Sequence, residues 1–363
     1  SLQASGKEVL IDNCYYEIGD DGAVFKKAGN NLMKYKGTFV FPDSIVYEDK
    51  EYPVIGIVRF TNAVGMDSIV LPKTLKFIED CAFYRTAVRT LVLPEGFERL
   101  GNNVFSLTTC FHKIYIPSTI KEVGTIFALY NCKDNRGEIH VADLDAWCRA
   151  KCGCVSAGAQ WDFYVGEGKI SEVDIPEGIT EMDKQFSYCR SITSVKIPAS
   201  VQSISDSAFM YASNINTFTF AENSSLKTVG VRGFCYCRNN LSLPEGLTEI
   251  KDYAFEQCTC ERISIPTTLK KVGKDVWGDV KAIQVPDLLT WLNLDLIYTE
   301  DHNRSKHRLF VGEEELKKLT VPEDATVKNN AFRHISSLEE VVFPAGCKTD
   351  IGDYAFSYCV NLK

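Results

Sequence analysis

The sequence lacks any run of about 18 apolar residues, the length that a membrane-spanning helix requires, so we expect no transmembrane segment. It also lacks a P-loop, a G-x-G-x-x-G phosphate cradle, a G-x-S-x-G nucleophile elbow and an H-E-x-x-H zinc motif. Only 5 histidines are present among 363 residues. These absences remove the familiar signatures of catalysis, and we expect no enzymatic activity and no cofactor.

Basic residues are also scarce, since 40 lysines and arginines face 48 aspartates and glutamates, for a formal net charge of -8. The one basic cluster, residues 302–308, is too short to neutralise a phosphate backbone, so we expect no nucleic-acid partner. The first residues lack the charged and apolar regions of a secretory signal, which is typical of a mature or trimmed chain. A hydrophobic content of 45% nevertheless predicts a folded protein.

What the sequence has in abundance is a repeated pair, an apolar residue followed by proline. Most successive pairs are 22 or 23 residues apart. A fixed period of this length predicts a solenoid, in which each turn buries its apolar face against its neighbours. Phe220-Ala221 fills one vacant place, and the pairs are Leu71-Pro72, Leu93-Pro94, Ile116-Pro117, Ile175-Pro176, Ile197-Pro198, Leu243-Pro244, Ile265-Pro266, Val285-Pro286, Val321-Pro322 and Phe343-Pro344.

The second half of each repeat is equally regular. An apolar residue precedes an aromatic residue by five positions, as Ile78 precedes Phe83 and Ile250 precedes Phe255. The segment before each proline alternates with period two, as in residues 68–71, which indicates a strand. Proline ends that strand at the same place in every turn, so we expect strands of successive turns to pair in parallel about 4.8 Å apart.

Two stretches, at about 139–170 and 283–316, break the period and resemble each other. Each contains V-x-D-L-x-x-W and closes with Val-Gly-Glu. The aspartate of each motif is a candidate helix N-cap, which would turn Trp147 or Trp291 inward. Each stretch is therefore predicted to be a variant repeat that carries a short helix.

Together these features predict a repeat solenoid over residues 56–363, preceded by an N-terminal β-hairpin lead-in over residues 1–55. The solenoid should be right-handed and rich in β-structure, with a parallel sheet and two helix-containing insert modules. A further strand and proline would be due after Lys363, so either the natural chain continues or the last turn is an imperfect cap.

The repeat resembles that of the BspA-like, or Treponema-type, leucine-rich repeat family. The clearest match is residues 186–198, Phe-Ser-Tyr-Cys-Arg-Ser-Ile-Thr-Ser-Val-Lys-Ile-Pro, and the resemblance covers nearly everything from about residue 35 onward. It implies a leucine-rich-repeat-like fold and a secreted or cell-surface protein of a host-associated bacterium. It also implies adhesion to a host or extracellular-matrix protein, although a fold does not by itself fix a function.

Fourteen cysteines raise the question of disulfides or bound metal. Cross-rung disulfides between Cys235 and Cys258 or between Cys237 and Cys260 remain an alternative to free thiols. Four cysteines follow the repeat's aromatic residue by three positions, where other repeats have threonine, alanine or isoleucine, which indicates a small buried slot. These four are Cys189, Cys237, Cys258 and Cys359.

Two residue groups have the chemistry of metal ligands. Cys148, Cys152 and Cys154 lie close together but lack a histidine at zinc-site spacing, so we expect no metal there. Asp301, His302 and His307 share a loop that could hold a metal, but a solvated polar insertion is the better interpretation.

The strand residue between two inward apolar positions should point outward. This position is apolar in three early repeats, at Val70, Val92 and Tyr115, and we predict partner binding there because contiguous exposed apolar strips often mark interfaces. A solvated sheet face is the alternative interpretation. In later repeats the same position holds Asp174, Lys196, Thr219, Ser242, Ser264, Gln284, Thr320 and Val342.

We therefore predict a monomeric, non-catalytic adhesion or interaction module that binds a protein partner through its solenoid surface. One alternative is a carbohydrate-binding or enzymatic site beside Trp147 and Trp291, with a glycan as ligand. Another is a structural spacer that holds a further domain away from the cell. Exposed tryptophan rings would favour the carbohydrate alternative.

Overall fold

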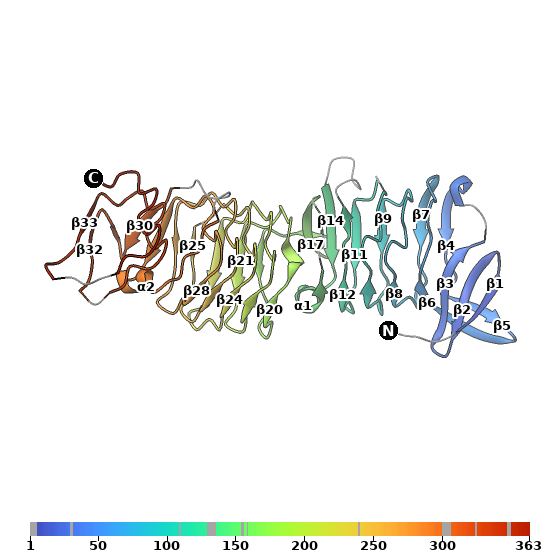
Figure 1. The fold of residues 1–363 in the computed structure, drawn as a ribbon. Coiled ribbons are helices and arrows are strands. Elements are labelled where there is room, and N and C mark those ends of the chain that lie inside the picture. The colour runs from blue at the N-terminus through green and yellow to red at the C-terminus, as the bar shows by residue number, and fades with distance from the viewer. Residues whose placement is uncertain are drawn as a thin grey trace. The chain divides into compact units, whose positions relative to one another are not determined.

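The computed structural model describes residues 6–29, 32–108, 110–128, 136–153, 156–157, 159–238, 240–299, 306–323, 325–346 and 350–363. The chain forms two compact units, one of residues 1–171 with 187–191 and the other of residues 172–186 with 192–363. In each unit, short strands from successive turns pair in parallel (Figure 1). The prediction of a parallel β-solenoid is confirmed.

The first unit begins with an antiparallel meander of β1 (Lys7–Ile11), β2 (Cys14–Gly19) and β3 (Gly22–Ala28). A 3-10 turn, η1 (Leu32–Lys34), follows. β3 pairs in parallel with β6 (Lys50–Ile57), so the meander joins the stacked turns through a continuous sheet.

Turns of the first unit contribute strands to two main sheets. The first segment of each turn, which precedes a proline in the ordinary repeats, forms β4 (Gly37–Val40), β7 (Met66–Val70), β9 (Thr90–Val92) and β11 (Lys113–Ile116). In the first variant module the equivalent strands are β14 (Arg136–Val141) and β17 (Gln160–Val165), which closes on β18 (Gly168–Lys169). The second segments form β8 (Phe77–Ile78), β10 (Arg99–Leu100), β12 (Glu122–Val123) and β15 (Lys151–Cys152), beside β6. β5 (Ser44–Tyr47) makes a hairpin with β6, and β13 (Phe127–Ala128) pairs with β16 (Ser156–Ala157).

The second unit repeats this arrangement. Its first segments are β19 (Glu172–Asp174), β21 (Ser194–Ile197), β23 (Thr217–Phe220), β25 (Leu241–Ser242), β27 (Ile263–Ser264), β29 (Ala282–Val285), β30 (Arg308–Val311), β32 (Lys318–Thr320) and β33 (Glu340–Val342). β31 (Glu314–Glu315) closes on β30 in an antiparallel pair, as β18 does on β17. Its second segments are β20 (Glu181–Met182), the 3-10 turn η2 (Lys184–Phe186), β22 (Ser203–Ile204), β24 (Thr228–Val229), β26 (Glu249–Ile250) and β28 (Lys271–Val272).

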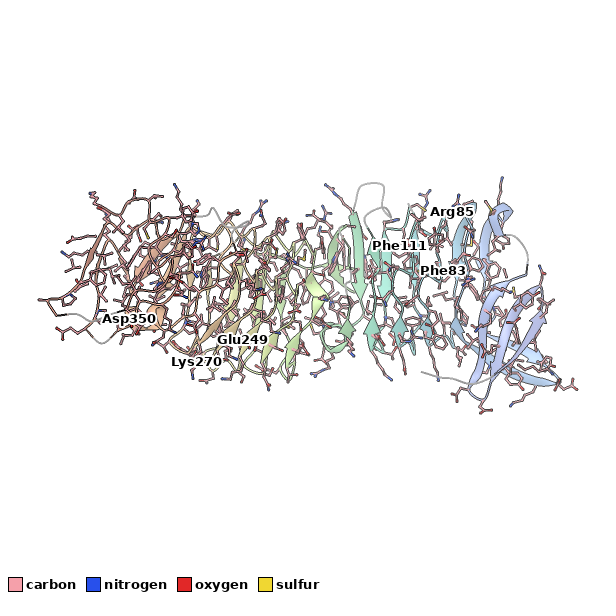
Figure 2. The ribbon with its side chains drawn as sticks, in the orientation of Figure 1. Phe83, Arg85, Phe111, Glu249, Lys270 and Asp350 are labelled. Atoms are coloured by element: carbon pink, nitrogen blue, oxygen red, sulfur yellow. The ribbon has the colours of Figure 1, made fainter. Side chains whose placement is uncertain are left out.

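The repeated aromatic residue forms the core of both units. Phe83, labelled in Figure 2, and Phe105 are fully buried in the first unit. In the second unit the Phe209, Phe234 and Phe255 rings stack almost in parallel, with centroid distances of 5.6 and 5.7 Å. The prediction of a buried aromatic residue in each of these turns is therefore confirmed.

In seven of the turns the aromatic residue is flanked by two left-handed corners, one two residues before it and one two residues after it; these residues are Phe83, Phe105, Phe209, Phe234, Phe255, Phe332 and Phe356. Cys81 and Arg85 flank Phe83 with φ of 56° and 54°, and Ser207 and Tyr211 have φ of 62° and 60° in a later turn. These corners place the aromatic residue on the inside of the turn although none of the four is glycine. Left-handed conformation is uncommon for such side chains, so packing between turns must hold them there.

An aspartate after the second strand links neighbouring turns. The Asp80 carboxylate accepts a hydrogen bond from the backbone N–H of Asn102 at 2.6 Å, and Asp252 does the same for Lys274 at 2.8 Å. A carboxylate that accepts a backbone N–H satisfies a donor that no strand pairing reaches. These bonds fix the spacing of the turns outside the two-residue strands.

Both variant modules contain the predicted helix. α1 (Leu144–Arg149) begins after Asp143, whose side chain accepts the N–H of Ala146, and α2 (Leu288–Leu292) begins after Asp287, which accepts the N–H of Thr290. In the described part of the chain, no helix is long and apolar enough to cross a membrane.

Candidate functional site

An exposed valine strip runs across the first-segment strands of the first unit. Val40 and Val92 are 62% and 61% exposed, and Val70 between them is 49% exposed. Val40 and Val70 are direct partners in the β4–β7 pair, and β7 lies beside β9, which carries Val92 (Figure 1). We call these three residues the valine strip. The structure thus places Val70 and Val92 on the outward face, as the sequence predicted.

The valine strip continues into an aromatic ladder of Tyr115, His140 and Tyr164. Val92, Tyr115, His140 and Tyr164 follow one another as direct partners across β9, β11, β14 and β17. The His140 ring lies 4.1 Å from the Tyr164 ring with an interplanar angle of 7°, and 4.6 Å from the Tyr115 ring. The valine strip and the aromatic ladder together are called the docking face below.

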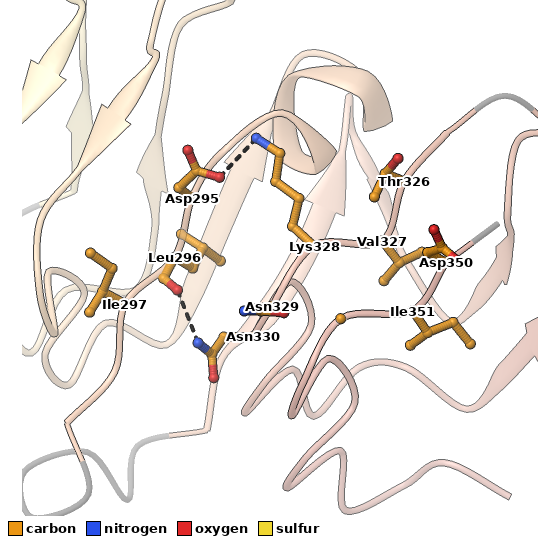
Figure 3. A pocket seen from close by; sticks show the side chains of 11 residues that line it. Asp295, Leu296, Ile297, Thr326, Val327, Lys328, Asn329, Asn330, Asp350 and Ile351 are labelled. Carbon is orange, nitrogen blue, oxygen red and sulfur yellow. Dashed lines mark hydrogen bonds and ion pairs between the residues drawn. The ribbon is translucent and has the colours of Figure 1, made fainter.

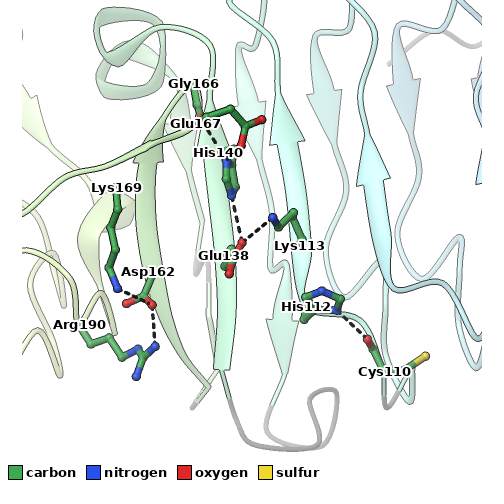
Figure 4. A network of polar contacts seen from close by, with 10 residues as sticks. All are labelled: Cys110, His112, Lys113, Glu138, His140, Asp162, Gly166, Glu167, Lys169 and Arg190. Atoms are coloured by element: carbon green, nitrogen blue, oxygen red, sulfur yellow. Dashed lines mark hydrogen bonds and ion pairs between the residues drawn. The ribbon is translucent and has the colours of Figure 1, made fainter.

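Charged groups beside the aromatic ladder are paired with one another (Figure 4). Lys113 lies 2.9 Å from Glu138, and Asp162 contacts both Lys169 and Arg190, at 3.0 and 2.6 Å. Burial acts to raise the pKa of Glu138, but hydrogen bonds from Lys113 and from the histidine beside it outweigh burial and leave that pKa below its usual value. The Glu138 carboxylate therefore stays ionised, and Lys113 neutralises its charge.

Most of the equivalent outward positions in the second unit are polar; the apolar exceptions are Phe310, which is buried, and Val342, which is half-buried. Asp174 and Lys196 form an exposed ion pair at 3.1 Å, and Ser242 and Ser264 are partners on β25 and β27. Isolated exposed ion pairs and hydroxyls are well solvated and contribute little binding energy. The exposed apolar part of the outward ladder thus lies in the first unit.

The sequence interpretation missed three members of the docking face. Val40 was assigned to the lead-in, although Phe41-Pro42 is an apolar-proline pair and could have identified its strand. His140 and Tyr164 lie in the first variant module, whose strands were not aligned with the ordinary repeats. The alternation of side chains in β14 and β17 could have identified both residues as outward, because the neighbouring Ile139 and Phe163 are buried.

The tryptophans of the two modules are core residues. Trp147 is 0% and Trp291 1% exposed, and Trp291 donates its Nε1–H to the carbonyl of Ala331 at 2.8 Å. A buried ring cannot stack on a sugar, so the carbohydrate alternative loses the surface on which it depended.

The second unit also contains an open cleft of about 550 Å³ between residues 295–297 and 326–328 (Figure 3). Side chains bridge its walls: Lys328 pairs with Asp295 at 2.9 Å, and Asn330 donates to the Leu296 carbonyl at 3.1 Å. These two contacts therefore connect the opposite walls of the cleft.

Residues with metal-ligand chemistry do not converge in the described ranges. Within them, no group of three histidine, cysteine or acidic residues is arranged to hold a metal. Cys154, Asp301 and His302 lie outside the described residues. His307 is 0% exposed and places Nδ1 2.6 Å from the Val280 carbonyl, so it lies in the core and not in a solvated loop.

The cysteines in the repeat slots are buried. Cys189, Cys237 and Cys258 are at most 1% exposed, as the repeat pattern predicted. Cys235 and Cys260 are free thiols, so neither of the cross-rung disulfides that the spacing allowed is present. Burial raises the pKa of the Cys237 and Cys258 thiols, which disfavours the reactive thiolate.

We expect Cys237 and Cys258 to resist an added thiol reagent in the folded protein, whereas the exposed Cys81 reacts readily. The cause is the low accessibility and raised pKa of the two buried thiols. Alkylation followed by peptide mass spectrometry, in buffer and in guanidinium, measures each site. Equal labelling of Cys81 and Cys258 under native conditions would show that the slots open.

The sequence matches the pattern of the BspA type leucine rich repeat region, in six copies, over residues 41–152, 162–284 and 293–363. The chain therefore belongs to the BspA-type leucine-rich repeat family. No protein with curated annotation resembles the chain closely enough to count as a relative.

Several solved structures are similar to the chain at low sequence identity. A leucine-rich repeat protein from Bacteroides ovatus is 16% identical with a TM-score of 0.47, covering 98% of this chain and 93% of that one. The pneumococcal vaccine antigen PcpA is 14% identical with a TM-score of 0.46, covering 96% and 98%. A leucine rich cell surface protein from Faecalibacterium prausnitzii is 16% identical with a TM-score of 0.33, covering 83% and 96%.

Proposed function

We propose that the protein is a secreted or cell-surface, non-catalytic interaction module that binds a host or matrix protein through the docking face. The observation that carries this proposal is the exposure of Val40, Val70 and Val92 on neighbouring strands, next to Tyr115. Contiguous exposed apolar side chains are uncommon on soluble proteins unless a partner covers them. Membership of a family that includes surface proteins supports the location.

The chemistry of the docking face indicates what kind of partner it fits. Stable interfaces have an apolar centre and a polar rim. Here the valine strip supplies the apolar centre, and the hydroxyls of Thr38 and Ser68, 2.6 Å apart, lie beside it. Lys113 and Glu138 neutralise each other, so a protein partner can cover them without burying an unpaired charge. The partner should therefore present exposed apolar side chains of its own.

Tyr115→Ala should weaken binding by about 1–3 kcal/mol, because a tyrosine at an interface supplies a large rigid contact surface with a polar tip. The assay measures the Kd for a panel of immobilised matrix proteins, namely fibronectin, fibrinogen, laminin and collagen, at fixed salt. The melting temperature should change little, since the ring lies outside the core.

The matched control is Thr219→Ala, an exposed outward position on β23 of the second unit, which should leave the Kd unchanged. Equal losses from both variants would place the site elsewhere or spread it over both units. Binding that neither variant alters would remove the docking face as the site. A chain that binds none of the panel would favour the spacer alternative.

A further inference from the structure

His140 occupies an unusual place in the docking face, because its side chain is almost fully enclosed. It is 2% exposed although it stands at an outward strand position, where Val92 is 61% exposed. The Tyr115 and Tyr164 rings cover its two faces at 4.6 and 4.1 Å. The imidazole is therefore the element that connects the two tyrosines of the aromatic ladder.

Both ring nitrogens of His140 face groups that can only accept a hydrogen bond. Nδ1 lies 2.8 Å from the Gly166 carbonyl oxygen, and Nε2 lies 3.1 Å from a Glu138 carboxylate oxygen (Figure 4). A carboxylate of Glu167 stands 3.8 Å from Nδ1. A neutral imidazole has a single N–H, so it can serve only one of the two acceptors. The imidazolium, with a proton on each nitrogen, satisfies both.

In the second variant module the position equivalent to His140 holds an uncharged residue, Gln284. Gln284 on β29 donates its amide N–H to the Gly312 carbonyl at 2.7 Å, as His140 Nδ1 does to Gly166. Its amide oxygen accepts a hydrogen bond from Ser264 at 2.9 Å. The amide N–H groups also reach the Glu313 carboxylate at 3.1 Å, and the amide oxygen also accepts from Arg262 at 3.4 Å. The neutral amide thus serves acceptors with its nitrogen and donors with its oxygen, whereas both nitrogens of the imidazole in the first module face acceptors.

We infer that His140 is a proton-binding site that holds the aromatic ladder in its binding arrangement, so that partner binding through the docking face weakens when this proton is lost. The effect on partner binding rests on the proposed function. The protonation of His140 does not, because it can be measured in the protein without a partner.

The consequence of losing the proton follows from the groups that surround the ring. From β11 these are Lys113 and Tyr115, from β14 Glu138, and from β17 and the turn after it Tyr164 and Glu167. When Nε2 releases its proton to solvent, its lone pair faces the Glu138 carboxylate and the contact becomes repulsive. Glu138 keeps its contact with Lys113, so the imidazole is the group that moves, and Tyr115 loses the ring on which it stacks.

The first experiment uses the free, full-length protein labelled with ¹⁵N-histidine and ¹³C-tyrosine, with His140→Gln to assign the signals. At pH 5.5 both His140 nitrogens should show imidazolium shifts. As the pH rises, the loss of that state should move the Tyr115 and Tyr164 ring signals at the same midpoint. A neutral His140 tautomer at pH 5.5, or tyrosine signals that ignore its titration, would overturn the inference whatever the partner is.

The second experiment measures the Kd of the tightest-binding protein of the matrix panel at pH 5.5 and pH 8.5. Wild type should bind at least tenfold more weakly at the higher pH, whereas His140→Gln, which copies the second module, should change by less than threefold. Equal pH dependence in both proteins would contradict the link. If the NMR result holds but Tyr115→Ala leaves binding intact, the proposed function fails and the proton site stands.

Discussion

Replacing Phe255 with alanine is expected to lower the free energy of unfolding by about 3–5 kcal/mol, the cost of removing a fully buried aromatic side chain. Phe255 is 0% exposed and lies between the Phe234 and Trp277 rings, at centroid distances of 5.7 and 6.3 Å. Each turn of a solenoid is stabilised mainly by its two neighbours, so a cavity at this position weakens both contacts. Chemical denaturation followed by circular dichroism measures the change.

The matched control is Phe343→Ala, which removes the same side chain from a position that is 42% exposed. This variant should cost about 1–2 kcal/mol, because only part of its apolar area is removed from water. A loss below 1 kcal/mol for Phe255→Ala, or equal losses for the two variants, would mean that the repeat's aromatic residue is not the core of the solenoid.

Acidification is expected to destabilise the protein through His334. Burial, followed by the nearby Arg333 and His307, lowers the pKa of His334 from 6.5 to about 4. Below pH 6.5 the unfolded chain binds a proton on this histidine, whereas the folded chain keeps it neutral. The contribution of neutral His334 to the free energy of unfolding is therefore fully present above pH 6.5 and is lost as the pH falls toward 4. Across that window the loss is about 3 kcal/mol, at 1.36 kcal/mol per pKa unit.

Asparagine is the appropriate substitution to isolate this effect, because His334 has a left-handed φ of 68° that asparagine tolerates. The free energies of unfolding of wild type and His334→Asn should be compared at pH 7.5 and pH 4.5. The advantage of wild type should shrink by about 2–3 kcal/mol at the lower pH. A constant difference between the two proteins would show that His334 is not held neutral by its surroundings.

The fold was predictable because the same physical constraint recurs in nearly every turn. The pairs that end in proline located the first-segment strands, and the aromatic residue of each turn located the core. The left-handed corners were not predictable from residue type. Glycine or asparagine usually adopts this conformation, but here Arg85 and Tyr211 do. Only the packing of neighbouring turns makes that backbone shape available to them.

The candidate site was predictable only in part. Val70, Val92 and Tyr115 followed from strand alternation, which places every second side chain on the outside. His140 did not, because alternation makes it outward while its enclosure comes from tyrosines on two other strands. Tyr115 and Tyr164 are 25 and 24 positions from His140 in the sequence. Their contacts with it depend on the register in which the strands of the variant module pair with β11, and repeat spacing does not predict that register.

The central claim is that a partner docks on the valine strip of the first unit, and paired charge substitutions test it most directly. Val70→Asp with Val92→Asp places two carboxylates on adjacent turns, and Ser242→Asp with Ser264→Asp does the same at equivalent positions of the second unit. For the tightest-binding matrix protein, the first pair should raise the Kd at least tenfold and the second by less than threefold, with both proteins folded. Equal effects, or a larger effect of the second pair, would contradict the account.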